Sequence, residues 1–371
     1  MKPLPFLLAI TLSSIPAALG WGKVGHEIVA NIAYNLLTPE TRNASYHILF
    51  PTDDFNATGD TSPLAAVANW ADTVRFTSNF AWTTPLHYCD VKDGPIEGGC
   101  PFTTEREGNG ESSTDDGGNS PCKFMYERDC GNDFCAVGAI VDFSDLSRNP
   151  ERLKLTSQSS AAKTQRRLRA ATDRHPIKVH NVTQRQSLML LIHIIGDIHQ
   201  PLHVARASDR GGNTIEVSFP EAFSGFRDER LGHSHEGWKL HSVWDTAIIE
   251  RAIRLYHNSS QHCFQSLIEE SLLTQANIEL WGACSVELGI DSRTCPSQWA
   301  EESFNDALTY AYGDENGHEV QSGANLTEEY FETRLEIVQR RLAAGGVRLA
   351  ATLEEIYGRG DNEAGVRVLK T

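Results

Sequence analysis

The sequence predicts a mainly α-helical protein with a single domain and a small β element. Apolar residues recur at the three- and four-residue spacing of buried helix faces through most of the chain. The clearest strand signal is at residues 214–219, directly after a Gly-rich turn. The chain has 371 residues and a hydrophobic content of 40%, which is enough for a sizeable core.

Residues 1–20 have the features of a secretory leader. Lys2 supplies positive charge, residues 6–15 are apolar, and residues 18–20 form a small-x-small cleavage site. The apolar part is too short to span a bilayer, and no later stretch has the ~18 apolar residues that a span needs. We therefore expect a secreted chain that begins at Trp21 and has no membrane anchor.

The cysteines and glycosylation sequons agree with a secretory route. Eight cysteines follow the leader, and none forms a Cys-x2-Cys pair of the zinc-binding type. Cys130 and Cys135 could close a tight disulfide turn. Five Asn-x-Ser/Thr sequons mark candidate glycosylation sites, at Asn43, Asn56, Asn181, Asn258 and Asn325.

The net charge excludes one class of partner-binding surface. It is −16 at pH 7, from 33 Lys and Arg against 49 Asp and Glu. Such a chain does not hold nucleic acid through a broad basic face, although it could be an enzyme that acts briefly on nucleic acid. Basic residues gather only at 148–174, where we expect a solvated face; a strip that contacts phosphates is the alternative.

Helices are expected along both halves of the chain. The first begins near Trp21, with an apolar stripe through Val24, Ile28, Ile32 and Leu36. Residues 84–90 are expected to be extended or a loop. Further helices are predicted at 39–50, 63–75, 262–276, 298–312, 327–344 and 347–357, the last two separated by a break at Gly345-Gly346. One more helix is expected to end near residue 200, and another to begin near residue 240.

Three segments lack helical or strand patterns. Residues 92–121 are rich in Gly, Ser and acidic residues and are expected to form an exposed loop. Residues 220–237 are irregular, and residues 359–371 are expected to be a disordered tail.

Candidate metal ligands stand at the end of the most apolar helix. His193 and Asp197 are four residues apart, so they share one helix face, and Pro201 ends the helix before His203. A lone His here would more often be a hydrogen-bonded core residue, and Asp a helix cap. His-x3-Asp-x5-His at the end of a buried helix instead favours metal ligation.

Further ligand-type residues lie elsewhere in the chain. His241 and Asp245 repeat the His-x3-Asp spacing, and His26 lies close to the new N-terminus, whose amine has a pKa near 8. Alone, His26 could be a surface residue, and Asp72 could form a surface ion pair with Arg75. Together the nitrogen and oxygen ligands suffice for three ions and favour Zn²⁺: Trp21, His26, Asp72, His87, His193, Asp197, His203, His241 and Asp245.

At these residues the sequence resembles the zinc-dependent single-strand-specific nucleases secreted by fungi and plants. This family shares an all-helical superfamily with zinc-dependent bacterial phospholipases C. The resemblance runs from Trp21 through most of the mature chain. It rests on Trp21-Gly-x-x-Gly-His26, Trp70-Ala-Asp72-x-x-Arg75, Leu86-His87-Tyr88-x-Asp90, His193-x3-Asp197-x-His-Gln-Pro-Leu-His203, Gly211-Gly-Asn213, Leu240-His241-x-x-Trp-Asp245 and Gly345-Gly-Val-Arg-Leu-Ala350.

The resemblance implies how the ligands are grouped. One zinc ion would be bound by Asp72, His87, His193 and Asp197. A close neighbour would be bound by Asp197, His26 and the amine and carbonyl of Trp21, so that Asp197 bridges the pair. A third would be bound by His203, His241 and Asp245.

The resemblance also implies roles for substrate-binding and catalytic residues. Arg75 would bind transition-state charge on the phosphoryl group, Asn213 would donate to a phosphate oxygen, and Asp72 would help to orient the attacking water. Tyr88 and Asp90 would form a base pocket. Stacking on an aromatic ring tolerates any base but requires that the base be unpaired, which favours single strands.

The chain departs from the family pattern at two places. Lys239 stands where Asn is expected, and the helix near residue 299 lacks a cysteine that many relatives carry. We therefore expect Cys122 to pair with Cys263, beside the local pairs Cys89–Cys100, Cys130–Cys135 and Cys284–Cys295.

These observations predict a tri-zinc nuclease domain at residues 21–358. Its expected reaction is hydrolysis of single-stranded RNA and DNA to 5′-phosphate products, with 3′-nucleotidase activity, by a monomer that binds nucleic acid and nucleotides but no membrane. One alternative is a phospholipase C-type enzyme, against which Tyr88, Asp90 and Asp245 argue. The other is a secreted zinc-binding protein without activity.

Overall fold

The computed structural model describes residues 20–56, 59–93, 100, 122–149, 182–220, 237–284 and 293–358. Several predicted segments lie wholly or mostly outside these ranges, so the structure does not test them: the leader, the loop at 92–121, the basic segment at 148–174, the irregular segment at 220–237 and the tail at 359–371.

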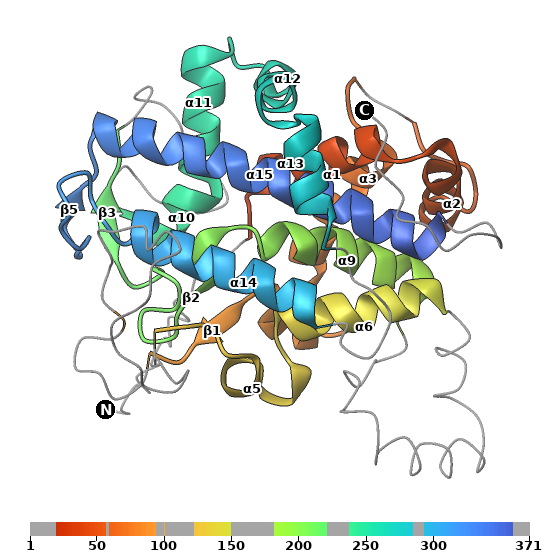
Figure 1. The fold of residues 1–371 in the computed structure, drawn as a ribbon, viewed down its shortest axis with the longest axis horizontal. Helices are drawn as coiled ribbons and strands as arrows, with labels where there is room; N and C mark the ends of the chain where they lie inside the picture. The colour runs from red at the N-terminus through yellow and green to blue at the C-terminus, as the bar shows by residue number, and fades with distance from the viewer. Residues whose placement is uncertain are drawn as a thin grey trace, which may run out of the picture.

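The fold is mainly α-helical with a small β component, as predicted (Figure 1). The α-helices are α1 Lys23–Leu36, α2 Pro39–Leu49, α3 Pro63–Ala68, α4 Trp70–Val74, α5 Tyr126–Asp129, α6 Ala136–Arg148, α9 Gln184–Asp197, α10 Leu240–Ser242, α11 Ile248–Tyr256, α12 Gln261–Leu272, α13 Gln275–Gly282, α14 Thr294–Asp306 and α15 Glu328–Tyr357. Short 3-10 or π-helical turns are η1 Ala81–His87, η2 Gly131–Asp133, η3 Pro201–His203, η4 Val243–Ala247 and η5 Ala307–Ala311.

Three helices, α2, α3 and α9, start at side-chain caps that can be read in the sequence. Thr38 and Ser62 each accept a backbone N–H bond at the starts of α2 and α3, and each is followed by a proline in the first turn. Thr183 and Gln186 form a reciprocal capping box at the start of α9. The starts of α2 and α3 lie at the positions predicted.

The core forms where α1, α9 and α15 meet. Ile28 and Ile32 of α1 are fully buried, and α15 runs across the molecule in Figure 1 and contacts both of the other helices. Every residue of α9 from Ser187 onward is buried. The polar residues at the end of α9 are therefore enclosed by protein.

The strands form two small sheets. β1 (Cys89–Val91) pairs in parallel with β2 (Val204–Arg206), and Asp90 lies opposite Ala205. In the second sheet β3 (Glu216–Ser218) lies between β4 (Trp238–Lys239) and β5 (Ala324–Asn325). The predicted strand at 214–219 is thus present but shorter. The β1–β2 pair was not predicted, and it brings the chain after His87 alongside the chain after His203.

Two predictions about helix continuity were wrong. The helix predicted at 63–75 is interrupted at Asn69, which leaves the helical conformation between α3 and α4. The predicted break at Gly345-Gly346 does not occur, because α15 is one helix of 30 residues. Both glycines instead allow close packing: a Cβ on Gly346 would lie 2.3 Å from Cγ2 of Ile32, and one on Gly345 would lie 3.3 Å from the ring of His199.

Two of the four predicted disulfides form, Cys130–Cys135 and Cys284–Cys295. The predicted pairs Cys89–Cys100 and Cys122–Cys263 are wrong, because Cys100 bonds with Cys122. Cys89 is a buried thiol in β1, and Cys263 is an exposed thiol in the first turn of α12. Spacing along the chain could not reveal that Cys89 faces the core.

No helix in the described part of the chain is both long and apolar enough to cross a membrane.

Replacing Gly346 with Ala should destabilise the fold although Ala is the better helix former. The added methyl group meets Ile32 at 2.3 Å in a packed core, and overpacking of this kind costs about 1–3 kcal/mol. Thermal unfolding should show a lower Tm. Glu336→Ala, on the exposed face of the same helix, is the control. A Tm at or above that of the wild type would contradict the packing role.

Candidate metal centre

Four ligand-type side chains converge at the end of α9. Nε2 of His193 lies 3.2 Å from Oδ2 of Asp197 and 3.6 Å from Oδ1 of Asp72. Nδ1 of His87 lies 2.9 Å from Oδ2 of Asp197 and 3.1 Å from Nε2 of His193. Ligand atoms about 2.0–2.1 Å from a tetrahedral ion are roughly 3.3 Å apart, so these separations fit a metal site.

The second carboxylate oxygen of Asp197 faces a different side chain. Its Oδ1 lies 3.3 Å from Nε2 of His26, which α1 brings to this point. Gly20 adjoins both groups, since a Cβ on it would lie 1.6 Å from Oδ1 of Asp197 and 2.8 Å from Nε2 of His26. The peptide that precedes the buried Trp21 therefore lies beside the group formed by His26 and Asp197.

A third group combines His203, His241 and Asp245. Nε2 of His241 lies 3.5 Å from Oδ2 of Asp245, and Nε2 of His203 lies 3.9 Å from Oδ1 of the same carboxylate. Here the repeated His-x3-Asp spacing extends into a π-helical turn, because Asp245 lies within η4.

Backbone carbonyl groups orient three of the imidazoles. Since a carbonyl oxygen only accepts, Nδ1–H of His193 donates to Ala68 at 2.7 Å. In the same way His203 donates to the carbonyl of His87 at 2.6 Å, and His241 donates to that of Gly211 at 2.6 Å. Each bond turns Nε2 toward the ligand group, the orientation that metal-binding histidines have in proteins.

The buried charges act strongly on one another. Burial opposes ionisation of Asp72 and Asp197, yet the charge of His193 holds the pKa of both carboxyls below the usual range. Burial also disfavours charge on His193, but Asp197 and Asp72 raise its pKa to about 10. Burial and then the charge of His193 lower the pKa of His26 to about 4. The carboxylates thus attract a cation, while His26 is kept neutral as a ligand must be.

Some buried polar atoms have no hydrogen-bond partner among the described residues. They include Nε2 of His26, Oδ1 of Asp72 and Oδ1 of Asp197. Buried polar atoms are normally paired, and exceptions call for an explanation such as a bound ion. These atoms all face the ligand groups, so the residues present fit metal ions, and all nine predicted ligand residues except Trp21 belong to groups that could hold one.

The other predicted site residues lie around this centre. Arg75 is buried, and its Nε is 3.4 Å from Oδ1 of Asp72. Tyr88 follows His87 and is half-buried, whereas Asp90 is exposed in β1. The amide of Asn213 donates to the carbonyl of Arg210 at 2.8 Å. In the structure Asn213 therefore closes its own turn, and its contact with phosphate stays a prediction.

Two residues that orient ligands were not predicted. The amide of Gln200 donates to Oδ1 of Asp245 at 2.6 Å, and its oxygen accepts from the N–H of Leu202. Gly211 has φ +61°, and a Cβ on it would lie 2.2 Å from the carbonyl oxygen of Leu202, so only glycine can present its carbonyl to His241. The signal for Gln200 was its polar side chain between two ligands in a buried stretch.

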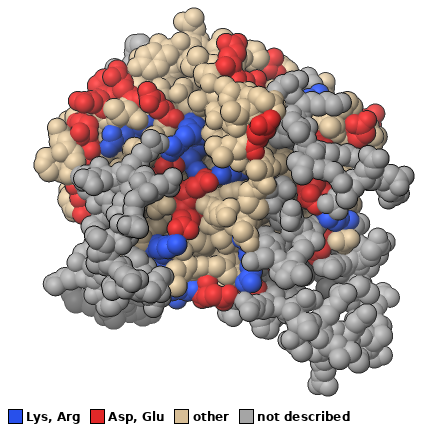
Figure 2. All heavy atoms as spheres, in the orientation of Figure 1, with Lys and Arg blue, Asp and Glu red and all other residues tan. Residues whose placement is uncertain are grey.

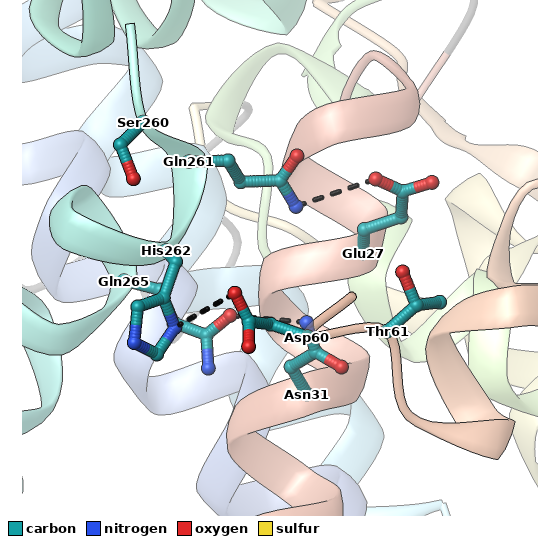
Figure 3. Close-up of a pocket in the computed structure, with 8 residues that line it drawn as sticks. All are labelled: Glu27, Asn31, Asp60, Thr61, Ser260, Gln261, His262 and Gln265. Carbon is teal, nitrogen blue, oxygen red and sulfur yellow. Dashed lines mark hydrogen bonds and ion pairs between the residues drawn. The ribbon is translucent and has the colours of Figure 1, made fainter. Parts of the chain in front are cut away.

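A polar pocket lies away from the centre, between α1, the loop before α3 and the start of α12 (Figure 3). Its buried amides are already paired, because Asn31 donates to Gln265 and Gln265 donates to Glu269. Gln261 donates to Glu27 at its rim. The pocket therefore offers no unpaired buried ligand group of the kind found at the metal centre.

Comparison with known proteins gives one consistent result. The family model described as S1/P1 Nuclease matches residues 21–358. Endonuclease 4 of Arabidopsis thaliana is 33% identical over 358 residues, covering 95% of this chain and 94% of the relative. Nuclease S1 of Aspergillus oryzae is 27% identical over 359 residues (95% and 98%), and Nuclease P1 of Penicillium citrinum is 26% identical over 345 residues (91% and 98%). Because the family model spans nearly the whole chain, the protein belongs to the S1/P1 nuclease family.

Proposed function

We propose that the protein is a secreted zinc-dependent endonuclease that hydrolyses single-stranded RNA and DNA to 5′-phosphate products, with 3′-nucleotidase activity. The observation that carries this proposal is the position of Asp197. Its two oxygens face different imidazoles, at 2.9 Å from His87 and 3.3 Å from His26, which suits a carboxylate that bridges two ions.

Three zinc ions per chain are proposed. The first would be bound by Asp72, His87, His193 and Asp197, and the third by His203, His241 and Asp245. The second would use Asp197, His26 and the Trp21 amine and carbonyl. All are imidazole, carboxylate, amine or carbonyl ligands, the set that suits zinc. When bound, such ions lower the pKa of water and stabilise charge on phosphoryl and leaving oxygens.

The side chains around the centre have complementary tasks in this proposal. Arg75 is oriented by Asp72 and aims its fork of donors at the charge of the transferring phosphoryl group. Asp72 also helps to orient the attacking water. Asn213 donates to a phosphate oxygen, and Tyr88 and Asp90 bind the unpaired base of the leaving nucleoside.

The charge distribution supports a local binding mode for the substrate. On the face shown in Figure 2, Lys and Arg are scattered among Asp and Glu and form no broad basic surface in the described part of the chain. A polyanion would therefore be bound at the centre, where bound ions are the largest local charges.

Secretion and maturation follow from the same proposal. Removal of residues 1–20 would free the Trp21 amine beside His26 and Asp197 and leave a monomeric domain at 21–358. The disulfides agree with an oxidising compartment. Four sequon asparagines lie exposed and are candidates for glycosylation, namely Asn43, Asn56, Asn258 and Asn325.

Replacing His193 with Ala or Asp197 with Asn should remove bound zinc and activity together, because both side chains serve the same buried group. Metal analysis and an assay on single-stranded DNA measure the two effects. His262→Ala, at an exposed histidine, should change neither. Full activity in a zinc-free preparation would refute the proposed metal dependence.

Replacing Gln200 with Met should weaken the third site while leaving the other two intact. The variant keeps the volume but loses the 2.6 Å hydrogen bond to Asp245, and loss of such a ligand-orienting bond typically lowers metal affinity by about 10–100-fold. Titration with a chelator should show one ion released more readily. Gln321→Met, at the surface, is the control; identical release curves would contradict the role of Gln200.

Arg75→Lys should lower kcat on single-stranded DNA by about 100-fold or more with zinc content unchanged, since Lys keeps the charge but loses the fork of donors. Arg340→Lys, away from the centre, is the control. A zinc-binding protein without activity would show no turnover in either form. A phospholipase C-type enzyme would hydrolyse phosphatidylcholine in preference to DNA.

A further inference from the structure

Phe76 is an exposed aromatic residue at the edge of the proposed site. It follows Arg75 directly, after the end of α4, and is 64% exposed, whereas Arg75 is 2% exposed. A single exposed apolar residue needs no explanation by itself. Phe76 is of interest because its ring contacts Arg75.

The ring of Phe76 packs on the guanidinium group of Arg75. Cζ of Arg75 lies 5.2 Å from the ring centroid, within the range of a cation–π interaction. One face of the ring is thus occupied, and the large exposed fraction shows that much of the remainder is accessible. The contact holds the ring in place, so a planar ligand would find a platform that is already oriented.

Short contacts link this ring to the metal ligands. Nε of Arg75 lies 3.4 Å from Oδ1 of Asp72, and the same oxygen lies 3.6 Å from Nε2 of His193. Arg75 therefore connects the ring of Phe76 to the ligand groups.

The surroundings of Phe76 do not favour a protein-binding surface. The three residues that follow it, Thr77, Ser78 and Asn79, are polar and exposed, so this part of the chain adds no further apolar side chain beside the ring. An isolated aromatic ring beside a phosphate-binding cation instead suits single-stranded nucleic acid, which combines phosphate contacts with base stacking.

Building on the proposed function, we propose that Phe76 stacks with the nucleobase on the 3′ side of the scissile phosphate. Tyr88 and Asp90 bind the base of the leaving nucleoside, Arg75 binds the phosphate between the two bases, and Phe76 binds the next base. Phe76 thereby gives the enzyme a preference for polynucleotides over 3′-mononucleotides without selecting a sequence.

A thermodynamic cycle that combines one change in the enzyme with one change in the substrate tests this assignment. The wild type and Phe76→Ala are compared on the dinucleotide d(ApA), on the same molecule lacking the 3′-side base, and on 3′-AMP, which has no 3′-side nucleoside. In the wild type, loss of the 3′-side base should raise KM by about 5- to 100-fold, as expected for one stacked base. In Phe76→Ala that difference should disappear, and KM and kcat for 3′-AMP should match the wild type.

Further variants separate stacking from other effects. Phe76→Trp should retain the preference for d(ApA), and Leu280→Ala, at a residue that is 70% exposed on α13, is the control for loss of a surface apolar side chain. Equal loss of activity on d(ApA) and 3′-AMP would overturn the proposal, because Phe76 would then act only by supporting Arg75. An unchanged KM for d(ApA) in Phe76→Ala would overturn it as well.

The failure of the proposed function has a different signature. A wild-type protein that hydrolyses neither substrate rejects the nuclease assignment. In that case the same cycle is measured as dissociation constants for d(ApA) and the abasic analogue. Binding that depends on the 3′-side base in the wild type but not in Phe76→Ala would still support the stacking role, and binding that ignores this base would reject it.

Discussion

Asp197 ends α9 with both carboxylate oxygens facing imidazole rings and with no surface exposed to solvent. A carboxylate at such depth is unfavourable unless it is paired and hydrogen-bonded. Asp72 and Asp245 are buried nearby, so three carboxylates share one interior region. The positions of His26, His87, His193, His203 and His241 follow from this constraint, since each imidazole lies against at least one of these carboxylates.

The surrounding helices hold this region rigid. α1 carries His26 and packs closely on α15 because Gly346 leaves room for Ile32. Behind the end of α9, Nε2 of His199 receives a hydrogen bond from Arg348, and Arg348 makes two contacts of 2.7 Å with Glu302 of α14. The residues just after Asp197 are thus tied to two other helices, which limits movement of the ligand groups.

The site also accounts for how an acidic protein could act on a polyanion. Its net charge is −16, and on the face shown in Figure 2 the described Lys and Arg residues are scattered among Asp and Glu. Attraction would arise at one point, where Arg75 and bound ions lie together, and aromatic side chains would contribute binding that does not depend on charge. Such a surface would release its products more readily than a broad basic face.

The sequence by itself determined most of the helices, the paired His-x3-Asp spacings and the membership of a nuclease family, because capping, helical periodicity and ligand spacing are local properties. It also identified eight side chains that the structure brings together into ligand groups. Tertiary structure alone decided the β1–β2 pairing, the partner of Cys122 and the unbroken course of α15, where the glycines serve contacts with α1 and with His199, which follows α9. It also decided that Gln200 orients Asp245 and that Phe76 lies on Arg75. Except for the contact between Phe76 and Arg75, these features join residues far apart in the chain, and even that contact depends on which way two side chains turn. Spacing along a sequence does not carry this information, because packing in three dimensions sets it.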